Sequence, residues 1–287
     1  MNQQNTDHNR QKKIAAVNDM TGFGRCSLAA SIPIISHLGV QCCAVPTAIL
    51  SNHTGFPSFY LDDYTRHFTA YTEEWKKLGL RFRAILTGFL GSEEQFRLVE
   101  GFINDFTRPG TVVCVDPVMG DYGRLYSSYT DGMCRAMRTL VERAQIITPN
   151  LTEACILTDT EYHPGVWRRK ELSALLTKLH AMGPEKIVIT GIPQGEFIAN
   201  LSSTVNTPPS LTRQHRVGEQ RSGTGDVFAS IVAADAVNGV PFDRSIRRAS
   251  AFVKKCILRS IELGIPATDG VCFEEVLHQL RREGNAT

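Results

Sequence analysis

The sequence predicts a single α/β domain built on a mostly parallel central sheet with helices on both faces. Short apolar runs rich in β-branched residues, such as TVVCV at 111–115 and KIVIT at 186–190, alternate with longer helical patterns along almost the whole chain. Runs that are apolar throughout are typical of strands buried on both faces, as in a parallel sheet between helices. The 287 residues include 42% apolar and 21% charged side chains, which is enough for one large core.

The first half of the chain is expected to alternate regularly between strand and helix. Strands are predicted over residues 14–17, 40–45, 84–86 and 111–115, and helices over residues 26–38, 62–78, 92–106 and 127–141. In the first helix, the apolar side chains of Leu28, Ile32, Ile35 and Leu38 recur at helical spacing. The third helix is expected to begin after Ser92 as N-cap, with Gln95 three residues later.

The second half continues the alternation and then becomes helical. Strands are predicted over residues 145–148 and 186–190, an antiparallel pair over 197–201 and 211–217, and helices over 151–157, 169–182, 225–237, 245–263 and 273–282. No linker, repeat or low-complexity tract interrupts the pattern. Residues 14–287 are therefore predicted to form one domain, preceded by a flexible polar tail over residues 1–13.

Composition narrows the function classes. The balance of 31 basic against 29 acidic residues gives a net charge of +2, so neither nucleic acid nor an anionic membrane surface is expected as a partner. No apolar run is long enough for a membrane span and no leader is recognised, which predicts a cytoplasmic protein. The eight cysteines form no C-x-x-C pair and are expected to be reduced, structural thiols.

Polar and glycine-rich segments follow the predicted strands, where a fold of this class binds its ligand. In Gly223-Thr224-Gly225-Asp226, two glycines allow a tight turn that exposes backbone N–H groups at the start of a helix, which is an anion site. Asp226 in the first helical turn could take a proton from a hydroxyl that attacks a bound phosphate. The alternative is a plain loop in which Asp226 only caps the helix.

A second constellation follows the strand at 145–148. Asn150 and Glu153 lie three residues apart on a short helix, and an amide with a carboxylate there suits a hydrated Mg²⁺. The alternative is a capping box with Asn150 as N-cap and Glu153 as its partner. Asp116 and Asp121, after the strand at 111–115, could serve cations or a nucleotide, or could be turn residues. His53 is expected to be a hydrogen-bonded loop residue.

Five segments together resemble one known family. They are Thr47 running into SNHTG at 51–55, TGFLGS at 87–92, DPVMGD at 116–121, TPNLTEA at 148–154 and GTGD at 223–226. Their order and spacing are similar to those of the ribokinase-like superfamily and, within it, the pyridoxal kinase family, over roughly residues 14–280. A G-x-x-x-x-G-K-[ST] phosphate loop, the other common route to ATP, is absent from the sequence.

The resemblance implies transfer of the γ-phosphate of ATP to the 5′-hydroxyl of pyridoxal, pyridoxamine or pyridoxine by a homodimer, with Mg²⁺ and a monovalent cation. It implies these roles: Asp226 as catalytic base with Gly223, Thr224 and Gly225 as its anion hole; Asp116, Thr148, Asn150, Glu153 and Thr190 at the nucleotide; Glu153, Asn150 and Asp116 at the metal; Asn18, Asp19, Thr47 and Phe89 at the substrate. The stretch 120–125 resembles a flap over ATP.

The sequence departs from the family where the substrate ring should lie. The family's first strand commonly ends in serine and histidine, whereas this chain has Asn18 and Asp19, and Phe89 stands where a tyrosine is common. Asn18 could replace the serine toward the ring. Asp19 could face the amine of pyridoxamine, or face solvent and cap a turn. The favoured prediction is a vitamin B6 kinase; the alternatives are a hydroxymethylpyrimidine kinase and a non-catalytic sensor that binds a nucleotide or pyridoxal phosphate.

Overall fold

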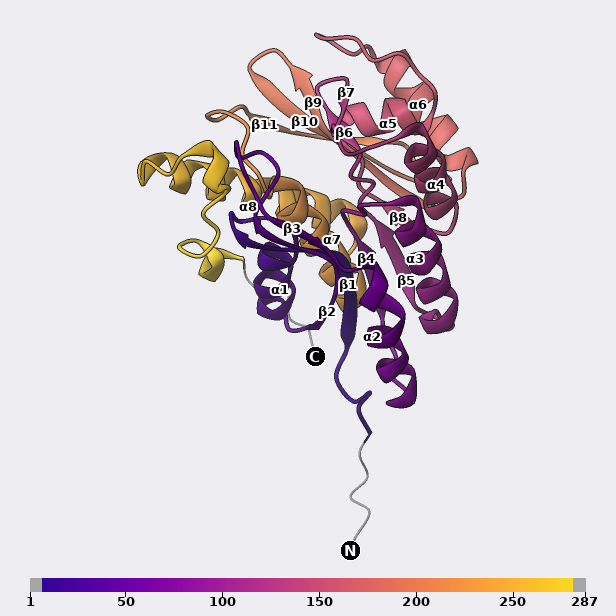
Figure 1. Ribbon diagram of the computed structural model, residues 1–287. Helices are drawn as coiled ribbons and strands as arrows, with labels where there is room; N and C mark the ends of the chain where they lie inside the picture. Colours follow the sequence, from indigo (N-terminus) through magenta and orange to yellow (C-terminus); the bar gives the residue numbers. More distant parts are fainter. Residues whose placement is uncertain (1–6, 281–287) are drawn as a thin grey trace, which may run out of the picture.

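A nine-stranded sheet between two layers of helices forms the centre of the computed structural model, which describes residues 7–280 (Figure 1). The strand order is β11-β10-β9-β8-β5-β4-β1-β2-β3. All pairings from β9 across to β2 are parallel, and antiparallel strands are added at both edges. The predicted mostly parallel α/β sheet is therefore confirmed.

The elements have the following bounds. The strands are β1 (Lys13–Phe23), β2 (Gln41–Asn52), β3 (Leu61–Asp63), β4 (Ala84–Thr87), β5 (Val112–Val115), β6 (Gly120–Asp121), β7 (Arg124–Leu125), β8 (Ile146–Ile147), β9 (Lys186–Gln194), β10 (Phe197–Thr204) and β11 (Ser210–His215). The α-helices are α1 (Ser27–His37), α2 (Thr65–Lys77), α3 (Glu93–Phe106), α4 (Asp131–Glu142), α5 (Leu151–Leu157), α6 (Arg169–Ala181), α7 (Thr224–Asn238) and α8 (Phe242–Glu262).

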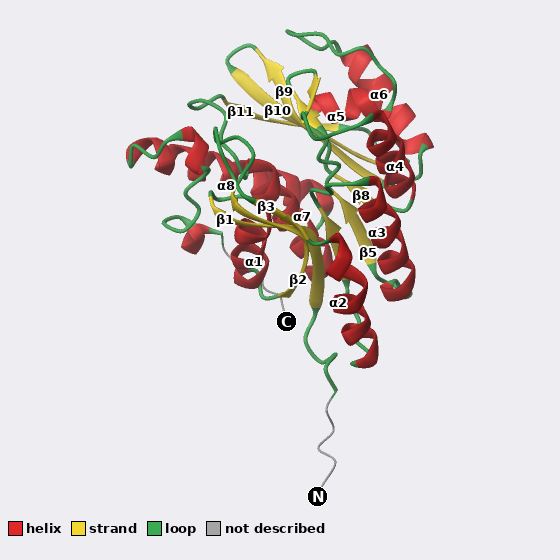
Figure 2. Ribbon diagram, viewed as in Figure 1, coloured by secondary structure: helices red, strands yellow, loops and turns green. Residues whose placement is uncertain are grey.

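Alternation along the central strands creates the two cores. In β5, Val113 and Val115 join the core that α2 to α6 cover, whereas Cys114 joins the core that α1, α7 and α8 cover. Ile146 and Ile147 of β8 divide between the two cores in the same way. Figure 2 shows the helices on either side of the strands. The same alternation decides which helical layer is faced by the side chain that follows a strand.

Several predicted elements differ in extent or type. β1 and β2 run well beyond their predicted ends, and β3 adds a short antiparallel edge strand to them. The predicted helix at 273–282 is wrong for its described part, because that segment contains only the short 3₁₀ turn Leu277–Gln279. Its apolar residues pack into the second core while the amide of Cys272 donates to Ser260 Oγ, and these contacts hold the chain in an irregular path.

The predicted tail at 1–13 lies partly outside the described residues. Of the described part, Lys13 already belongs to β1 and is buried, and Asn9 bonds to the backbone of Gly79 and Arg81. Ordered structure thus begins earlier than predicted. The described cysteines are all free, and six of the eight are buried. Among residues 7–280, no helix combines the length and apolarity that crossing a bilayer would require.

Candidate active site

The carboxyl ends of the parallel strands bring together most of the predicted site residues. Asn18, directly after the stretch of β1 that pairs with β4, lies on the side of the sheet that faces α7, as do Asp116 after β5 and Thr148 after β8. Thr148 Oγ1 donates to Asp116 Oδ1 (2.8 Å), and Asn18 Nδ2 donates to Asp226 Oδ1 (3.0 Å). The first bond joins the ends of β8 and β5, and the second joins β1 to the first turn of α7, at the edge where a parallel sheet is expected to bind its ligand.

The Gly223–Asp226 segment forms a tight entry into α7. Gly223 is the N-cap and has a φ of 81°, in the left-handed region that glycine adopts without strain. A Cβ on Gly223 would clash with the carbonyl of Arg25, so this close approach also requires glycine. Asp226 lies in the first helical turn, as predicted. The free N–H groups and the dipole of the helix favour an anion at this point.

The Asp226 carboxylate lies among other acids. Burial and, to a smaller extent, the charge of Asp19 raise the pKa of Asp226 to about 6, against the opposing effect of hydrogen bonds from the Ser27 backbone and the Asn18 side chain. A carboxylate with a pKa near the working pH can accept a proton more readily than an ordinary one.

Asp116 and Glu153 are buried carboxylates in the same site, with exposed fractions of 8% and 4%. Burial and the charge of Asp226 raise the pKa of Asp116 to about 7. Burial and the charge of Asp116 raise the pKa of Glu153 well above its ordinary value. Because the charge of Asp226 acts on Asp116 and the charge of Asp116 acts on Glu153, a cation placed among these acids would relieve their repulsion.

Asn150 and Glu153 form a complete capping box at the start of α5. Asn150 Oδ1 accepts from the Glu153 amide (2.9 Å), and Glu153 Oε2 accepts from the Asn150 amide (2.8 Å). The capping interpretation is therefore confirmed, but it does not use the whole side chains. Asn150 Nδ2 also donates to the carbonyl of Gly120, and Glu153 Oε1 accepts from the Met119 amide. The pair thus also holds the loop that leads from Asp116.

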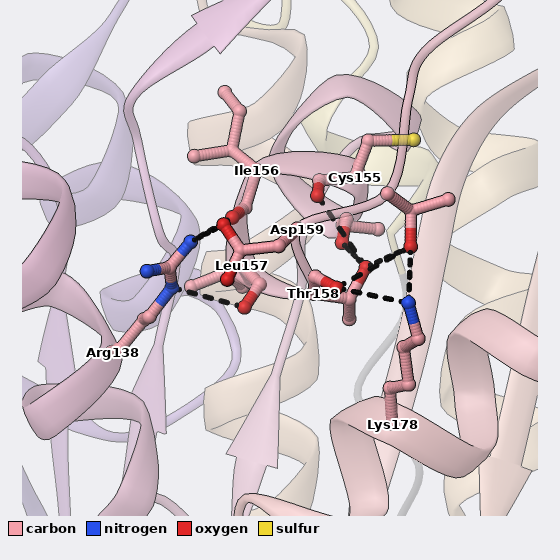
Figure 3. Close-up of polar contacts among 9 residues, drawn as sticks. Arg138, Cys155, Ile156, Leu157, Thr158, Asp159 and Lys178 are labelled. Atoms are coloured by element: carbon pink, nitrogen blue, oxygen red, sulfur yellow. Dashed lines mark hydrogen bonds and ion pairs between the residues drawn. The ribbon is translucent and has the colours of Figure 1, made fainter.

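Neighbouring helices fix the far end of α5 (Figure 3). Arg138 from α4 donates to the carbonyls of Ile156 (2.6 Å) and Leu157 (3.1 Å) and pairs with Asp159. Lys178 from α6 donates to the carbonyl of Thr158 (3.1 Å). Cations at a helix C-terminus satisfy free carbonyls and favour the helix dipole. The seven-residue helix that presents Glu153 is therefore held at both ends.

The donor set fits a magnesium ion. Asp116 and Glu153 offer buried carboxylate oxygens, which Mg²⁺ prefers, and a cation between them would offset the repulsion between their charges. Within residues 7–280, no three acidic, histidine or cysteine side chains are placed to hold a metal by themselves. This arrangement suits an ion that keeps water and phosphate oxygens as its other ligands.

The predicted substrate residues lie within β1 and β2 and just after β4. Thr47 is buried, and its hydroxyl donates to the carbonyl of Phe89 (3.0 Å). Asp19 is 4% exposed and accepts from Thr21 Oγ1 (2.6 Å), so the alternative that it faces solvent is wrong. The reason is that β1 continues to Phe23 instead of turning after Val17, which buries Asp19 beside α1.

The structure also shows the surroundings of Thr190 and His53. Thr190 continues β9 and donates its amide to the carbonyl of Pro149 (2.8 Å), next to Asn150. His53 bonds through Nε2 to the carbonyl of Thr268 (2.6 Å), and its Nδ1 accepts from the Gly55 amide, as a loop histidine was expected to do. The stretch 120–125 forms the β6–β7 hairpin, whose Asp121 meets Gln220.

Sequence reasoning missed two residues at the site. Tyr129 is buried, its hydroxyl has no hydrogen-bond partner among the described residues, and burial together with the charge of Glu153 raises its pKa. Gly88 lies against Asn18, because a Cβ there would lie 2.5 Å from Asn18 Cγ. The glycine within TGFLGS was a visible signal for Gly88, whereas nothing in the local sequence marked Tyr129.

Comparison with known proteins agrees with this geometry. The profile of the phosphomethylpyrimidine kinase family matches residues 26–270. The chain belongs to the phosphomethylpyrimidine kinase family. Curated relatives of this kinase include a pyridoxine/pyridoxal/pyridoxamine kinase of Bordetella avium, 29% identical, with 89% of this chain and 90% of the relative covered. A pyridoxal kinase of Bos taurus is 30% identical, with 72% and 71% covered.

Solved structures show the same fold. A protein of Bacteroides thetaiotaomicron, assigned provisionally as a phosphomethylpyrimidine kinase, is 36% identical, with a TM-score of 0.93 over 98% of both chains. Its crystal form with pyridoxal has a TM-score of 0.88 and covers 96% of this chain and 98% of that one. The pyridoxal kinase of Lactobacillus plantarum is 25% identical, with a TM-score of 0.86 over 94% and 96%. The resemblance to pyridoxal kinases of the ribokinase-like fold is confirmed.

Proposed function

We propose that this kinase transfers the γ-phosphate of ATP to the 5′-hydroxyl of a vitamin B6 vitamer: pyridoxal, pyridoxamine or pyridoxine. The observation that carries the proposal is the position of Asp226 in the first turn of α7, directly after the glycine-flanked N-terminus. The 36% identical Bacteroides protein was crystallised with pyridoxal, which supports a B6 substrate for this chain as well.

In the proposed reaction, Asp226 accepts the proton of the substrate hydroxyl as its oxygen attacks the γ-phosphorus. The new O–P bond forms while the bond from that phosphorus to the β–γ bridging oxygen breaks, and ADP leaves. The backbone N–H groups of Gly223, Thr224 and Gly225 would stabilise the charge that develops on the phosphoryl oxygens.

Asp116 and Glu153, with Asn150, would hold the Mg²⁺ that accompanies ATP, directly or through its waters. Bound there, the ion would neutralise phosphate charge during the transfer. Thr148 would orient Asp116 through its hydrogen bond. Thr190 would line the nucleotide site, and Thr47 and Phe89 the substrate site. By resemblance to the pyridoxal kinase family, we also propose that the protein forms a homodimer, uses a monovalent cation and is located in the cytoplasm.

A hydroxymethylpyrimidine kinase is the second candidate. The description of the matching family favours it, as does an acid, Asp19, which stands shortly before Gly22 and Gly24 in the sequence. Both candidates phosphorylate a primary alcohol on a heteroaromatic ring, so the same phosphate machinery serves either substrate.

A turnover assay separates the candidates. ATP and Mg²⁺ are supplied with pyridoxal, pyridoxamine, pyridoxine or hydroxymethylpyrimidine, and both ADP and the phosphorylated product are measured, with Asp226→Asn as the negative control. We expect product from at least one B6 vitamer. Turnover of hydroxymethylpyrimidine alone would show that the protein is a hydroxymethylpyrimidine kinase, the second candidate. Binding of nucleotide without any product would show a sensor.

A further inference from the structure

The side chain of Asn18 has a fixed orientation in β1, directly after the stretch that pairs with β4. Its Oδ1 accepts from two backbone N–H groups, those of Phe89 (2.8 Å) and Asp19 (2.9 Å). Two N–H donors require an oxygen at that position, so the amide nitrogen must point the other way. Nδ2 therefore faces Asp226, and donates to its Oδ1 at 3.0 Å.

The surroundings of Asn18 leave it little freedom to turn. The residue is 6% exposed. Gly88 lies directly against it, because a Cβ there would lie 2.5 Å from Asn18 Cγ and 2.8 Å from its Oδ1. The bond from Asn18 to Asp226 also joins two parts of the chain 208 residues apart. A buried amide held by two backbone groups is a rigid donor toward the carboxylate.

We propose that Asn18 is a positioning residue. Its hydrogen bond occupies Oδ1 of Asp226 and fixes the orientation of the carboxylate that accepts the substrate proton. The inference rests on the proposed role of Asp226 as base. Asn18 holds Oδ1 of Asp226 and the Ser27 backbone also donates to this carboxylate, so the direction in which it presents its remaining lone pairs is fixed. A donor to the ionised form also favours the deprotonated carboxylate that a base requires.

The titratable groups that face Asp226 come from several elements. The charge of Asp19 from β1 raises the pKa of Asp226. Burial chiefly, and the charge of Asp226 in addition, raise the pKa values of Asp116 after β5, Cys26 before α1 and Tyr126 after β7. Against burial and the charge of Asp19, the bond from Asn18 acts together with the backbone of Ser27 to favour the ionised form of Asp226. Loss of the Asn18 bond must therefore move the pKa of Asp226 upward.

The test compares pH profiles of turnover for Asn18→Ala and Asn18→Asp with wild type. Asn18→Asp keeps the acceptor for the Phe89 and Asp19 amides, and so remains informative where Asn18→Ala does not fold. We expect kcat at pH 7 to fall about tenfold to a hundredfold, the loss typical of a hydrogen bond to a charged group. The acid limb should move to higher pH, further in Asn18→Asp, while KM for ATP stays within about twofold of wild type.

A matched control is Asn238→Ala. Asn238 Nδ2 donates to the carbonyl of Leu38 (3.0 Å) at the opposite end of α7, so this variant removes a comparable bond from the same helix. Its pH profile should equal that of wild type. In the Asp226→Asn background, Asn18→Ala should cause no further loss of turnover, because its effect acts through the carboxylate.

Two results would overturn the inference without touching the proposed function. The first is that Asp226→Asn is inactive while Asn18→Asp keeps the wild-type kcat and the acid limb of its pH profile does not move. The other is an Asn18 variant whose only defect is a higher KM for the B6 vitamer, which would make Asn18 a substrate contact. Wild-type turnover by Asp226→Asn would instead refute the proposed base itself.

Discussion

Replacement of Glu153 by glutamine tests whether the capping box at α5 also serves the metal. The Glu153 carboxylate accepts from two amides, Asn150 (2.8 Å) and Met119 (3.2 Å), one on each oxygen. Glutamine can accept only one of these bonds, and its NH₂ group would face the other N–H. The charge that a nearby Mg²⁺ or its waters would use is lost as well.

The expected changes in stability and in magnesium dependence differ in size. One lost hydrogen bond to a charged group costs roughly 1.5–3 kcal/mol. Removal of a buried carboxylate whose pKa is raised offsets part of this cost, so we expect the free energy of unfolding to fall by only about 1 kcal/mol. No such offset applies to the metal, and the Mg²⁺ concentration for half-maximal rate should rise about 10- to 100-fold.

The assay is a magnesium titration of the initial rate at saturating substrate, together with thermal unfolding. Glu171→Gln is the matched control, because Glu171 closes a similar box at the start of α6 through the Arg168 amide (2.6 Å), away from the site. This control should leave the magnesium titration unchanged. An unchanged titration in Glu153→Gln with a lower melting temperature would refute the metal role and leave the cap alone.

Three further changes act around the base. Asp226→Asn should lower kcat about 10²- to 10⁴-fold while ATP still binds, measured by calorimetry, whereas Asp131→Asn in the first turn of α4 should retain activity. Asp19→Asn removes a charge that raises the pKa of Asp226, so the acid limb of kcat, near pH 6, should move to lower pH; an unmoved limb would contradict this coupling. Gly223→Ala places a Cβ against the Arg25 carbonyl, at a residue whose φ is 81°. The free energy of unfolding, measured by denaturant titration, should fall by more than about 1 kcal/mol, unlike the effect of an unstrained alanine substitution.

Local patterns in the sequence were sufficient for the parts of the fold that depend on neighbours along the chain. Ser92 accepts from the Gln95 amide as its spacing predicted, and α5 has the predicted bounds. The helix predicted from 127 begins only at Asp131, because Thr130 accepts from the Met133 amide and fixes the start there. The choice between several polar residues as N-cap depends on tertiary contacts that a local pattern does not contain.

The candidate site was predictable as a set of residues but not as a set of partners. The position after a strand identified Asp116, since the edge of a parallel sheet is set by topology, and the two glycines at the start of a helix identified Asp226. The partner of Asn18 was not predictable, because it depends on β1 continuing past Val17 and on Gly88 lying beside it. Glycine has no side-chain pattern that reveals which neighbour uses the space it leaves.

The anchoring of α5 by Arg138 and Lys178 has a consequence for the motions of the site. A helix of seven residues is too short to hold its shape alone and would fray within its first and last turns. Because side chains of α4 and α6 bind its last carbonyls, α5 can open only together with those helices. The acid that is proposed to hold the metal thus takes its rigidity from the helical layer behind it. The β6–β7 hairpin is anchored to the same helix, because the Gly123 amide donates to Thr152 Oγ1 of α5 (2.9 Å).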